Sequence, residues 1–251
     1  MSRTVLITGA TGKFGYVLVR HFLNAGDHVI AIGRSKEALN QLEATSIHPS
    51  RLHLLKIDLM ADDLGGLLIE ELSHLGKMPD CLINNARSHH SLGLDDEGKA
   101  RPESFLDEFK LGVVVPYELV MALANRPASC LRAVANVGSI YGTVVPNLKL
   151  YTNPEQQSPI QYGVTKAALA HLTKELAVRL ATKNIRVNCV AYGGVKGRVD
   201  EDFEQRYAAL CPSGRMLSEN EIVGPIDMLL SESASGITGH VLMVDGGYSV
   251  W

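Results

Sequence analysis

The hydrophobic positions along the chain follow two alternating patterns. Short apolar runs rich in β-branched residues, beginning with Val5-Leu6-Ile7, are typical of strands buried on both faces. Between them, apolar residues recur at i, i+3/i+4 and i+7, which is typical of helices with one buried face. Strands are predicted at 5–7, 28–32, 52–57, 81–83, 131–137, 185–191 and 241–244, and helices after residue 15 and at 36–44, 62–75, 103–124, 162–182, 200–210 and 219–230. The alternation predicts one α/β domain over residues 1–251.

A glycine-rich turn connects the first strand to the first helix. Gly9, Gly12 and Gly15 punctuate the stretch Thr8–Gly15, and the helical pattern of Val17 and Leu18 follows. Such a turn lets the backbone approach a pyrophosphate, whose charge the helix N-terminus stabilises. The alternative is a tight strand-to-helix turn without a ligand.

The end of the second strand bears on the choice of cofactor. An acidic residue there would bond the ribose 2′-hydroxyl of NAD, but Gly33 holds this place. Arg34, together with Lys13 of the glycine turn, could instead meet a 2′-phosphate, which favours NADP(H). If Arg34 stacks on adenine or faces solvent, NAD(H) stays possible.

Polar residues also end the third and fourth strands. Asp58 could accept a bond from the adenine amino group or cap the next helix. Asn84-Asn85 could join neighbouring strands and line a crevice. His89 and His90 are adjacent on a loop and point apart, so substrate contact or solvation is favoured over a metal site.

A tyrosine and a lysine stand four residues apart in a helical pattern. Tyr162 and Lys166 then lie on one face, where an ammonium favours the phenolate and permits proton exchange near neutral pH. Ser139, after the fifth strand, could bond a substrate oxygen or form a turn.

Two segments are predicted to cover the substrate. The polar, proline-containing stretch around 140–160 is too long for a minimal connection, and a lid is expected around 196–215 from its position. The turn Tyr192-Gly193-Gly194-Val195 could hold the nicotinamide amide with its backbone.

Charge and composition narrow the function classes. Of 251 residues, 24 are Lys or Arg and 27 are Asp or Glu, and no basic run marks a nucleic-acid partner. Without an apolar run of membrane-spanning length or a signal-type segment, we expect a cytoplasmic protein with no membrane partner. The four cysteines lie in or beside apolar segments and are expected to be buried free thiols.

Taken in order, the motifs resemble those of short-chain dehydrogenases/reductases of the single-domain branch. They are the glycine turn, Asp58, Asn84-Asn85-Ala86, Ser139, Tyr162-x-x-x-Lys166, Arg186-Val187-Asn188 and Thr238-Gly239 with Val244-Asp245-Gly246-Gly247, and they span essentially the whole chain.

The resemblance implies a Rossmann-like, doubly wound sheet of seven mainly parallel strands, a small-molecule substrate and a homotetramer or homodimer. It implies catalysis by Ser139, Tyr162 and Lys166, with Tyr162 as the acid/base, and no metal. Expected cofactor contacts are Gly9, Thr11, Gly12, Lys13, Phe14, Gly15, Arg34, Asp58, Leu59, Asn85, Ala86, Tyr162, Lys166, Gly193 and Val195; expected substrate contacts are Arg87, His89, Tyr141 and Tyr151.

Several positions depart from the family's pattern. The glycine spacing is that of the longer, sugar-modifying branch, whose C-terminal substrate domain this chain lacks. Arg87 replaces a Gly, Tyr192 replaces a Pro, and Gly112 falls where the family has the Asn that supports a proton-relay water. The interval from Ser139 to Tyr162 is also longer than usual.

These features predict an NAD(P)-dependent oxidoreductase acting on a hydroxyl or ketone of a polar, sugar-like substrate. Ser139-Ile140-Tyr141-Gly142 with the following insertion, and the ending Gly247–Trp251, are similar to reductases of bacterial surface-sugar or nonulosonate biosynthesis. Arg87, His89, His90, Lys149 and Asn153 could bond such a substrate. The alternatives are a hydride-returning epimerase or dehydratase, and a non-catalytic NADP-sensing protein, which Gly112 would favour.

Overall fold

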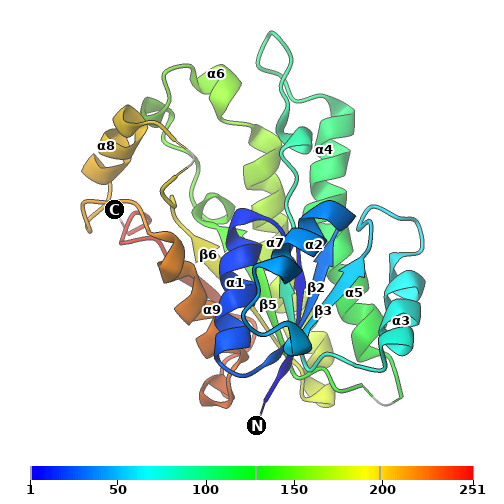
Figure 1. Ribbon diagram of the computed structural model, residues 1–251. Coiled ribbons are helices and arrows are strands. Elements are labelled where there is room, and N and C mark those ends of the chain that lie inside the picture. Colours follow the sequence, from blue (N-terminus) through cyan, green and yellow to red (C-terminus); the bar gives the residue numbers. More distant parts are fainter. Residues whose placement is uncertain (1, 128, 198, 251) are drawn as a thin grey trace.

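Seven parallel strands form one twisted sheet in the order β3-β2-β1-β4-β5-β6-β7. The computed structural model describes residues 2–127, 129–197 and 199–250 (Figure 1); Arg198 of the expected lid and Trp251 of the C-terminal motif lie outside them. The strand order reverses between β1 and β4, so the crevice there opens at the carboxyl ends of the strands. This confirms the predicted fold class. The strands are β1 Thr4–Thr8, β2 His28–Gly33, β3 Leu52–Lys56, β4 Cys81–Asn84, β5 Ala133–Ser139, β6 Arg186–Tyr192 and β7 Val241–Val244.

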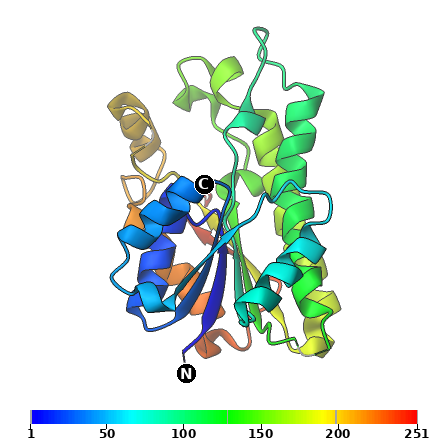
Figure 2. The same cartoon turned by 45° about the vertical axis from the view of Figure 1, so that its right-hand side comes forward.

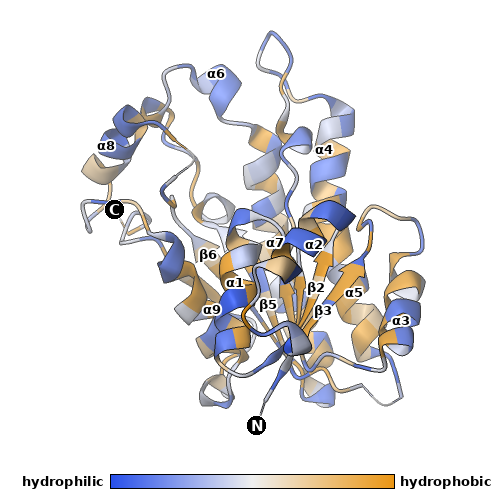
Figure 3. Cartoon of the chain, viewed as in Figure 1, coloured by the Kyte–Doolittle hydropathy of each residue, from blue (hydrophilic) through white to orange (hydrophobic). Residues whose placement is uncertain are grey.

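Helices cover both faces of the sheet, as Figure 2 shows most directly. One face carries α1 (Lys13–Asn24), α2 (Lys36–Ala44) and α9 (Val223–Leu230). The other carries α3 (Leu64–Leu75), α5 (Val115–Ala124) and α7 (Ile160–Leu180). The strands are apolar along their length, whereas the outer faces of most helices are polar (Figure 3). This is the pattern expected of a parallel sheet buried on both sides.

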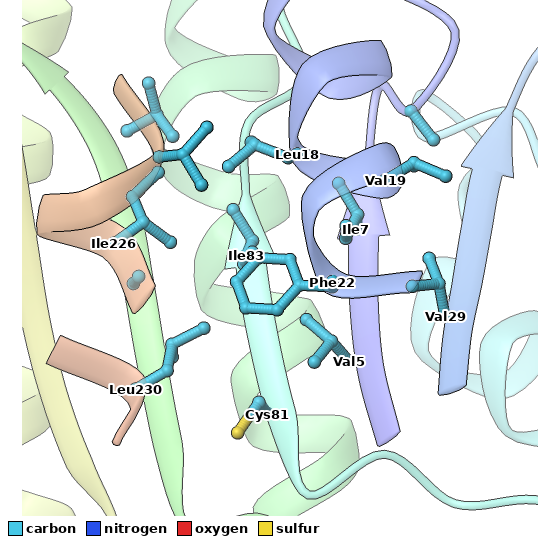
Figure 4. Packing of buried hydrophobic residues seen from close by; sticks show 14 of the residues in the cluster. Val5, Ile7, Leu18, Val19, Phe22, Val29, Cys81, Ile83, Ile226 and Leu230 are labelled. Atoms are coloured by element: carbon cyan, nitrogen blue, oxygen red, sulfur yellow. The ribbon is translucent and has the colours of Figure 1, made fainter. Parts of the chain in front are cut away.

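Two aliphatic clusters, one on each face, fill the space between sheet and helices. In the first, Phe22 of α1 lies beside Val5 and Ile83, and Ile226 and Leu230 of α9 face them (Figure 4). Phe22 is fully buried, so truncation to Ala would cost about 3–5 kcal/mol. These clusters hold the strand ends, and hence the site, in a fixed frame.

The long helix predicted over 103–124 is interrupted. It consists of α4 (Pro102–Phe109), a π-turn at Lys110–Val114, and α5. Pro116 has no N–H to donate to the carbonyl of Gly112, so the regular α-helical bond cannot form at this point. The π-turn accommodates that loss within a continuous helix.

The segments at the carboxyl end of the sheet form a third cluster. The expected substrate loop contains short helices at Ile140–Gly142 and Leu148–Leu150 and α6 (Pro154–Gln157), and the expected lid contains α8 (Glu201–Ala209). The two segments pack together through Ile140, Leu150, Tyr207 and Met216, and Arg206 Nε donates to the Leu150 carbonyl at 2.7 Å. They stand above the sheet in Figure 1.

Three of the four cysteines are buried, and the fourth is exposed. Cys81, Cys189 and Cys211 are buried free thiols as predicted, but Cys130 is exposed because it lies in the connection before β5 rather than in the strand. Within the described residues, no helix is both long and apolar enough to cross a bilayer.

Candidate active site

One large cavity opens at the carboxyl ends of the strands. Its volume is about 820 Å³, and its walls come from the segments that follow β1 to β6 and from α7. Because all seven strands are parallel, their carboxyl ends meet at this edge and bring distant motifs together.

The glycine turn is packed too closely for side chains. Gly9 has φ of +62°, and a Cβ at residue 15 would lie 2.2 Å from the Gly9 carbonyl oxygen. Helix α1 starts directly after Gly12, which offers no side-chain cap, so the N–H groups of its first turn stay available to a phosphate. Thr11, Lys13 and Phe14 also line this end of the cavity, whereas Gly15 does not.

The two cations expected at the 2′-phosphate are arranged differently. Arg34 is exposed and lines the cavity next to the buried Gly33. Lys13 Nζ lies 3.0 Å from the Glu219 carboxylate and also donates to the Lys196 carbonyl. Both cations line the cavity, but Lys13 already forms an ion pair, so the expectation of a 2′-phosphate contact rests mainly on Arg34.

The strand-end carboxylate and amides lie where the sequence predicts. Asp58 and Leu59 line the cavity, and Asp58 Oδ1 accepts a bond from the Met60 N–H at 3.0 Å, which closes a local turn. The cap of the next helix, α3, is Asp63, so the alternative that Asp58 caps this helix was wrong. Asn84 Nδ2 donates to Asn136 of β5 at 2.8 Å, and Asn85 Nδ2 donates to the Thr8 carbonyl at 2.9 Å. These amides join neighbouring strands, and Asn85 and Ala86 line the cavity.

Ser139, Tyr162 and Lys166 all line the cavity. Lys166 is buried, donates to the Val137 carbonyl at 2.8 Å, and its Nζ lies 5.7 Å from the centre of the Tyr162 ring. Ser139 Oγ accepts a bond from the Tyr141 N–H at 3.2 Å, which leaves its hydroxyl hydrogen to be donated. A phenol, an ammonium group and a hydroxyl donor thus line the same cavity.

The substrate end is lined mainly by aromatic rings. Tyr141 and Tyr151 line it as predicted, and their hydroxyl oxygens lie 3.1 Å apart. Phe203 and Tyr207 of α8 complete the wall, and sequence analysis did not single them out because the lid was inferred from position alone. The available signal was the presence of two aromatic residues within the short charged helix of the expected lid.

Arg87, His89 and His90 also line the cavity, whereas Lys149 and Asn153 do not. The expectation that Lys149 and Asn153 contact the substrate was wrong, because the segment between Ser139 and Tyr162 folds onto α8 and leaves both residues exposed. Within the described part of the chain, no three His, Cys, Asp or Glu side chains are grouped to hold a metal.

The turn after β6 is shaped by two tyrosines. Tyr192 is buried and donates to the Ile222 carbonyl, and burial raises the pKa of its hydroxyl. Tyr207 Oη accepts from the Gly194 N–H at 2.8 Å and would lie 2.6 Å from a Cβ at residue 193. Gly193 and Val195 therefore line the cavity through a turn that requires glycine.

Gly112 lies in the π-turn beside α7. A Cβ at this position would lie 2.4 Å from the Cγ2 methyl of Thr165. The Oγ1 atom of Thr165 and the Oε1 atom of Gln161, one helical turn apart, are buried without a partner among the described residues. The methyl of Thr165 thus occupies space that a side chain at 112 would need.

The cavity fits a nicotinamide dinucleotide on physical grounds. The glycine turn supplies a close backbone and an uncapped helix start for a pyrophosphate, Arg34 and Asp58 stand at the end beside β2 and β3, and Lys166 and Gly193 stand at the other end. Its volume leaves room for a small substrate beside Tyr162.

Comparisons with known proteins agree with this geometry. A family model described as Enoyl-(Acyl carrier protein) reductase matches residues 9–249. Post-translational flagellin modification protein A of Campylobacter coli is 27% identical over 259 residues, covering 99% of both chains.

Solved structures of similar fold also bind nicotinamide cofactors. A short-chain dehydrogenase from Leptospira borgpetersenii serovar Hardjo-bovis with bound NAD+ is 28% identical with a TM-score of 0.86, over 99% of this chain and 93% of that one. ElxO with NADP bound is 26% identical with a TM-score of 0.84, over the full length of both chains. The family model covers nearly the whole chain, and the chain therefore belongs to the short-chain dehydrogenase/reductase family of nicotinamide-dependent oxidoreductases.

Proposed function

We propose that this protein transfers hydride between a nicotinamide cofactor and a hydroxyl or ketone carbon of a polar, sugar-like small molecule. The observation that carries the proposal is the meeting of Ser139, Tyr162 and Lys166 in the same cavity as the glycine turn. The cofactor, when bound, would supply or accept the hydride. The protein's own share is orientation of the substrate and movement of one proton.

Each of the three side chains has a distinct part in the proposed reaction. Tyr162 Oη exchanges the proton with the substrate oxygen. Lys166, held by the Val137 carbonyl, keeps a positive charge beside the Tyr162 ring and favours the phenolate when the proton has left. Ser139 donates its hydroxyl hydrogen to the same substrate oxygen and holds it near Tyr162.

Within this function we favour NADP(H) as the cofactor. Support comes from Gly33 in place of an acidic residue and from the exposed Arg34 beside it. Because Lys13 is paired with Glu219, the preference rests on Arg34. Titration with NADPH and NADH, on wild type and Arg34→Ala, tests it: tighter NADH binding in wild type would overturn the choice.

The lining of the substrate end supports a polar, ring-shaped substrate. Tyr141 and Tyr151 offer both aromatic faces and hydroxyl groups, and Arg87 and His89 line the same cavity. Aromatic faces pack on the apolar faces of a sugar ring while polar groups take its hydroxyls.

The test is the change in nicotinamide absorbance across neutral keto-sugars, sugar acids, nucleotide sugars and acyl ketones, with product identified by mass. Net oxidation or reduction of one class, with one product per cofactor consumed, is expected. Product without cofactor consumption would point to the hydride-returning alternative. Tight NADPH binding with no product of any kind would point to a cofactor-sensing protein.

We further propose that the chain self-associates through α4 and α7. These adjacent helices expose Leu106, Phe109, Ile160 and Val164, although α7 also buries Leu169 and Leu176 on its inner side. A helix that is apolar on its outer as well as its inner face gains from burial against a partner. Sedimentation of wild type against Ile160→Lys/Val164→Lys tests this, with a monomeric wild type contradicting it.

A further inference from the structure

Arg87 stands directly against the proposed acid/base. It follows Asn85 and Ala86 after β4, and its Cζ lies 4.8 Å from the centre of the Tyr162 ring. The side chain is exposed and lines the cavity. The guanidinium therefore lies over the same ring whose hydroxyl reaches the substrate.

The charge of Arg87 is not met by a carboxylate of the described chain. Arg3, Arg132, Arg179 and Arg215 each form an ion pair, but none of the pairs among residues 2–127, 129–197 and 199–250 includes Arg87. A guanidinium stacked flat on an aromatic ring keeps its N–H donors, which lie in its own plane, available to a ligand. The distance of 4.8 Å between the Arg87 Cζ and the centre of the Tyr162 ring is compatible with such stacking.

Hydrogen bonds to α7 and α4 hold the loop that carries Arg87 in place. Gln161, the residue before Tyr162, donates to the Ser91 carbonyl at 3.0 Å, and Ser91 Oγ donates to the buried Glu108 at 2.5 Å. These bonds fix the loop to the first turn of α7 and to α4. The position of Arg87 relative to Tyr162 is thus built into the fold and does not depend on one surface contact.

The surroundings of Arg87 favour an anion on balance. His89 and His90 line the same cavity, and Lys166 Nζ lies 5.7 Å from the centre of the Tyr162 ring. Asp107 of α4 also lines the cavity, whereas Asp58 follows β3 at the other end. A planar guanidinium with free in-plane donors matches the two oxygens of a carboxylate or phosphate.

We propose that Arg87 binds an oxyanion of the substrate, a carboxylate or a phosphate, placed a few bonds from the carbon that exchanges hydride. This inference rests on the proposed oxidoreductase function and narrows its substrate class to hydroxy or keto acids and phosphorylated sugars. Arg87 then holds the substrate by its charge, while Ser139 and Tyr162 act on its oxygen.

The first experiment uses substrate pairs that differ only in charge. Sugar acids are compared with their methyl esters, and sugar phosphates with the parent sugars, by cofactor consumption. The anionic member is expected to have the higher kcat/KM, and the pair with the larger difference identifies carboxylate or phosphate as the group. Equal kcat/KM for both members of every pair would overturn the inference.

Variants of Arg87 test whether this residue causes the preference for anionic substrates. Arg87→Gln should raise KM for the anionic substrate roughly 10- to 100-fold and leave the neutral one nearly unchanged. Arg87→Lys keeps the charge without the planar fork and should fall between. Arg179→Gln, a surface arginine at the far end of α7, is the matched control and should behave as wild type. An equal loss on charged and neutral substrates would mean that Arg87 only supports Tyr162.

A binding measurement separates the two proposals. Protein saturated with NADPH is titrated calorimetrically with malonate and with inorganic phosphate, which needs no turnover. Binding of either ion that weakens at least tenfold in Arg87→Gln but not in Arg179→Gln supports the anion site even if every substrate pair is silent. If no substrate is turned over but an ion binds in this way, only the proposed oxidoreductase function is contradicted. If neither ion binds, the proposed anion site at Arg87 is contradicted.

Discussion

The two ends of the cavity are built from different parts of the fold. The cofactor end consists of strand ends and the glycine turn, where backbone meets backbone: Gly9 lies against Ala86, and Gly15 against the Gly9 carbonyl. The substrate end consists of the insertion and α8, which meet through side chains such as Tyr151 and Phe203, whose ring centres lie 5.5 Å apart. The first end has little freedom to change, whereas the second can alter its side chains while the sheet stays the same.

The largest effect on stability is expected at the cofactor end. Gly15→Ala places a Cβ 2.2 Å from the Gly9 carbonyl oxygen and 2.7 Å from Ala10, and both neighbours are backbone. It should lower the free energy of unfolding by about 3 kcal/mol and abolish NADPH binding. Gly12→Ala is the control, because its nearest contact is 3.3 Å. Equal denaturation midpoints for the two variants would contradict a closely packed turn.

Helix α7 connects the two ends, and its contact with the π-turn can be tested next. Gly112→Ala should cost about 2 kcal/mol because its Cβ meets the Thr165 methyl. Thr165→Ser removes that methyl, so the double variant should regain most of the loss. Additive losses in a double-mutant cycle would show that the two residues do not compete for the same space.

A smaller effect is expected where the insertion meets α8. Arg206→Met keeps much of the side-chain length but removes the bond to the Leu150 carbonyl, at a cost of about 1 kcal/mol. Substrate KM should rise with little change in NADPH affinity, which fluorescence titration measures. A matching loss of NADPH affinity would mean that the two ends are not independent.

The smallest effect is a local response to acid in the segment between α8 and α9. Hydrogen bonds from Arg215 and from Ser218 lower the pKa of Glu221 from 4.5 to about 2. The ionised form stabilises the folded segment, so this stabilisation is complete above pH 4.5 and is lost as pH falls towards 2. Amide exchange at residues 215–222, corrected for intrinsic rate, should accelerate over that range, and Glu221→Gln should remove the dependence. The same dependence in the variant would contradict the assignment.

Much of the fold could be predicted because the buried strands are short apolar runs with clear ends. The helix at Lys36–Ala44 and the strand at Val241–Val244 have the predicted bounds. The π-turn was not predicted, since hydrophobic periodicity does not report the missing N–H of Pro116.

Some residues of the site could also be predicted from the sequence, and others could not. Residues at strand ends, such as Asn85 and Ser139, could be placed because the topology of a parallel sheet brings them to one edge. The pairing of Lys13 with Glu219 and the entry of Tyr207 into the wall depend on how distant loops pack, which local patterns do not encode. The place of Thr165 beside Gly112 belongs to the same class.

The most direct test of the account compares two neighbouring tyrosines of the cavity. The ring centres of Tyr141 and Tyr162 lie 6.4 Å apart, and burial, together with Tyr151, raises the pKa of the Tyr141 hydroxyl, which stays protonated.

On the substrate found in the absorbance panel, Tyr162→Phe should lower kcat by about 10²- to 10⁴-fold, as expected for loss of a general acid/base, with NADPH affinity retained. Tyr141→Phe should lower it less than about tenfold, as expected for one lost hydrogen bond. A Tyr162→Phe enzyme that keeps most of its rate, or a Tyr141→Phe enzyme that loses as much, would contradict the assignment of Tyr162 as the group that exchanges the proton.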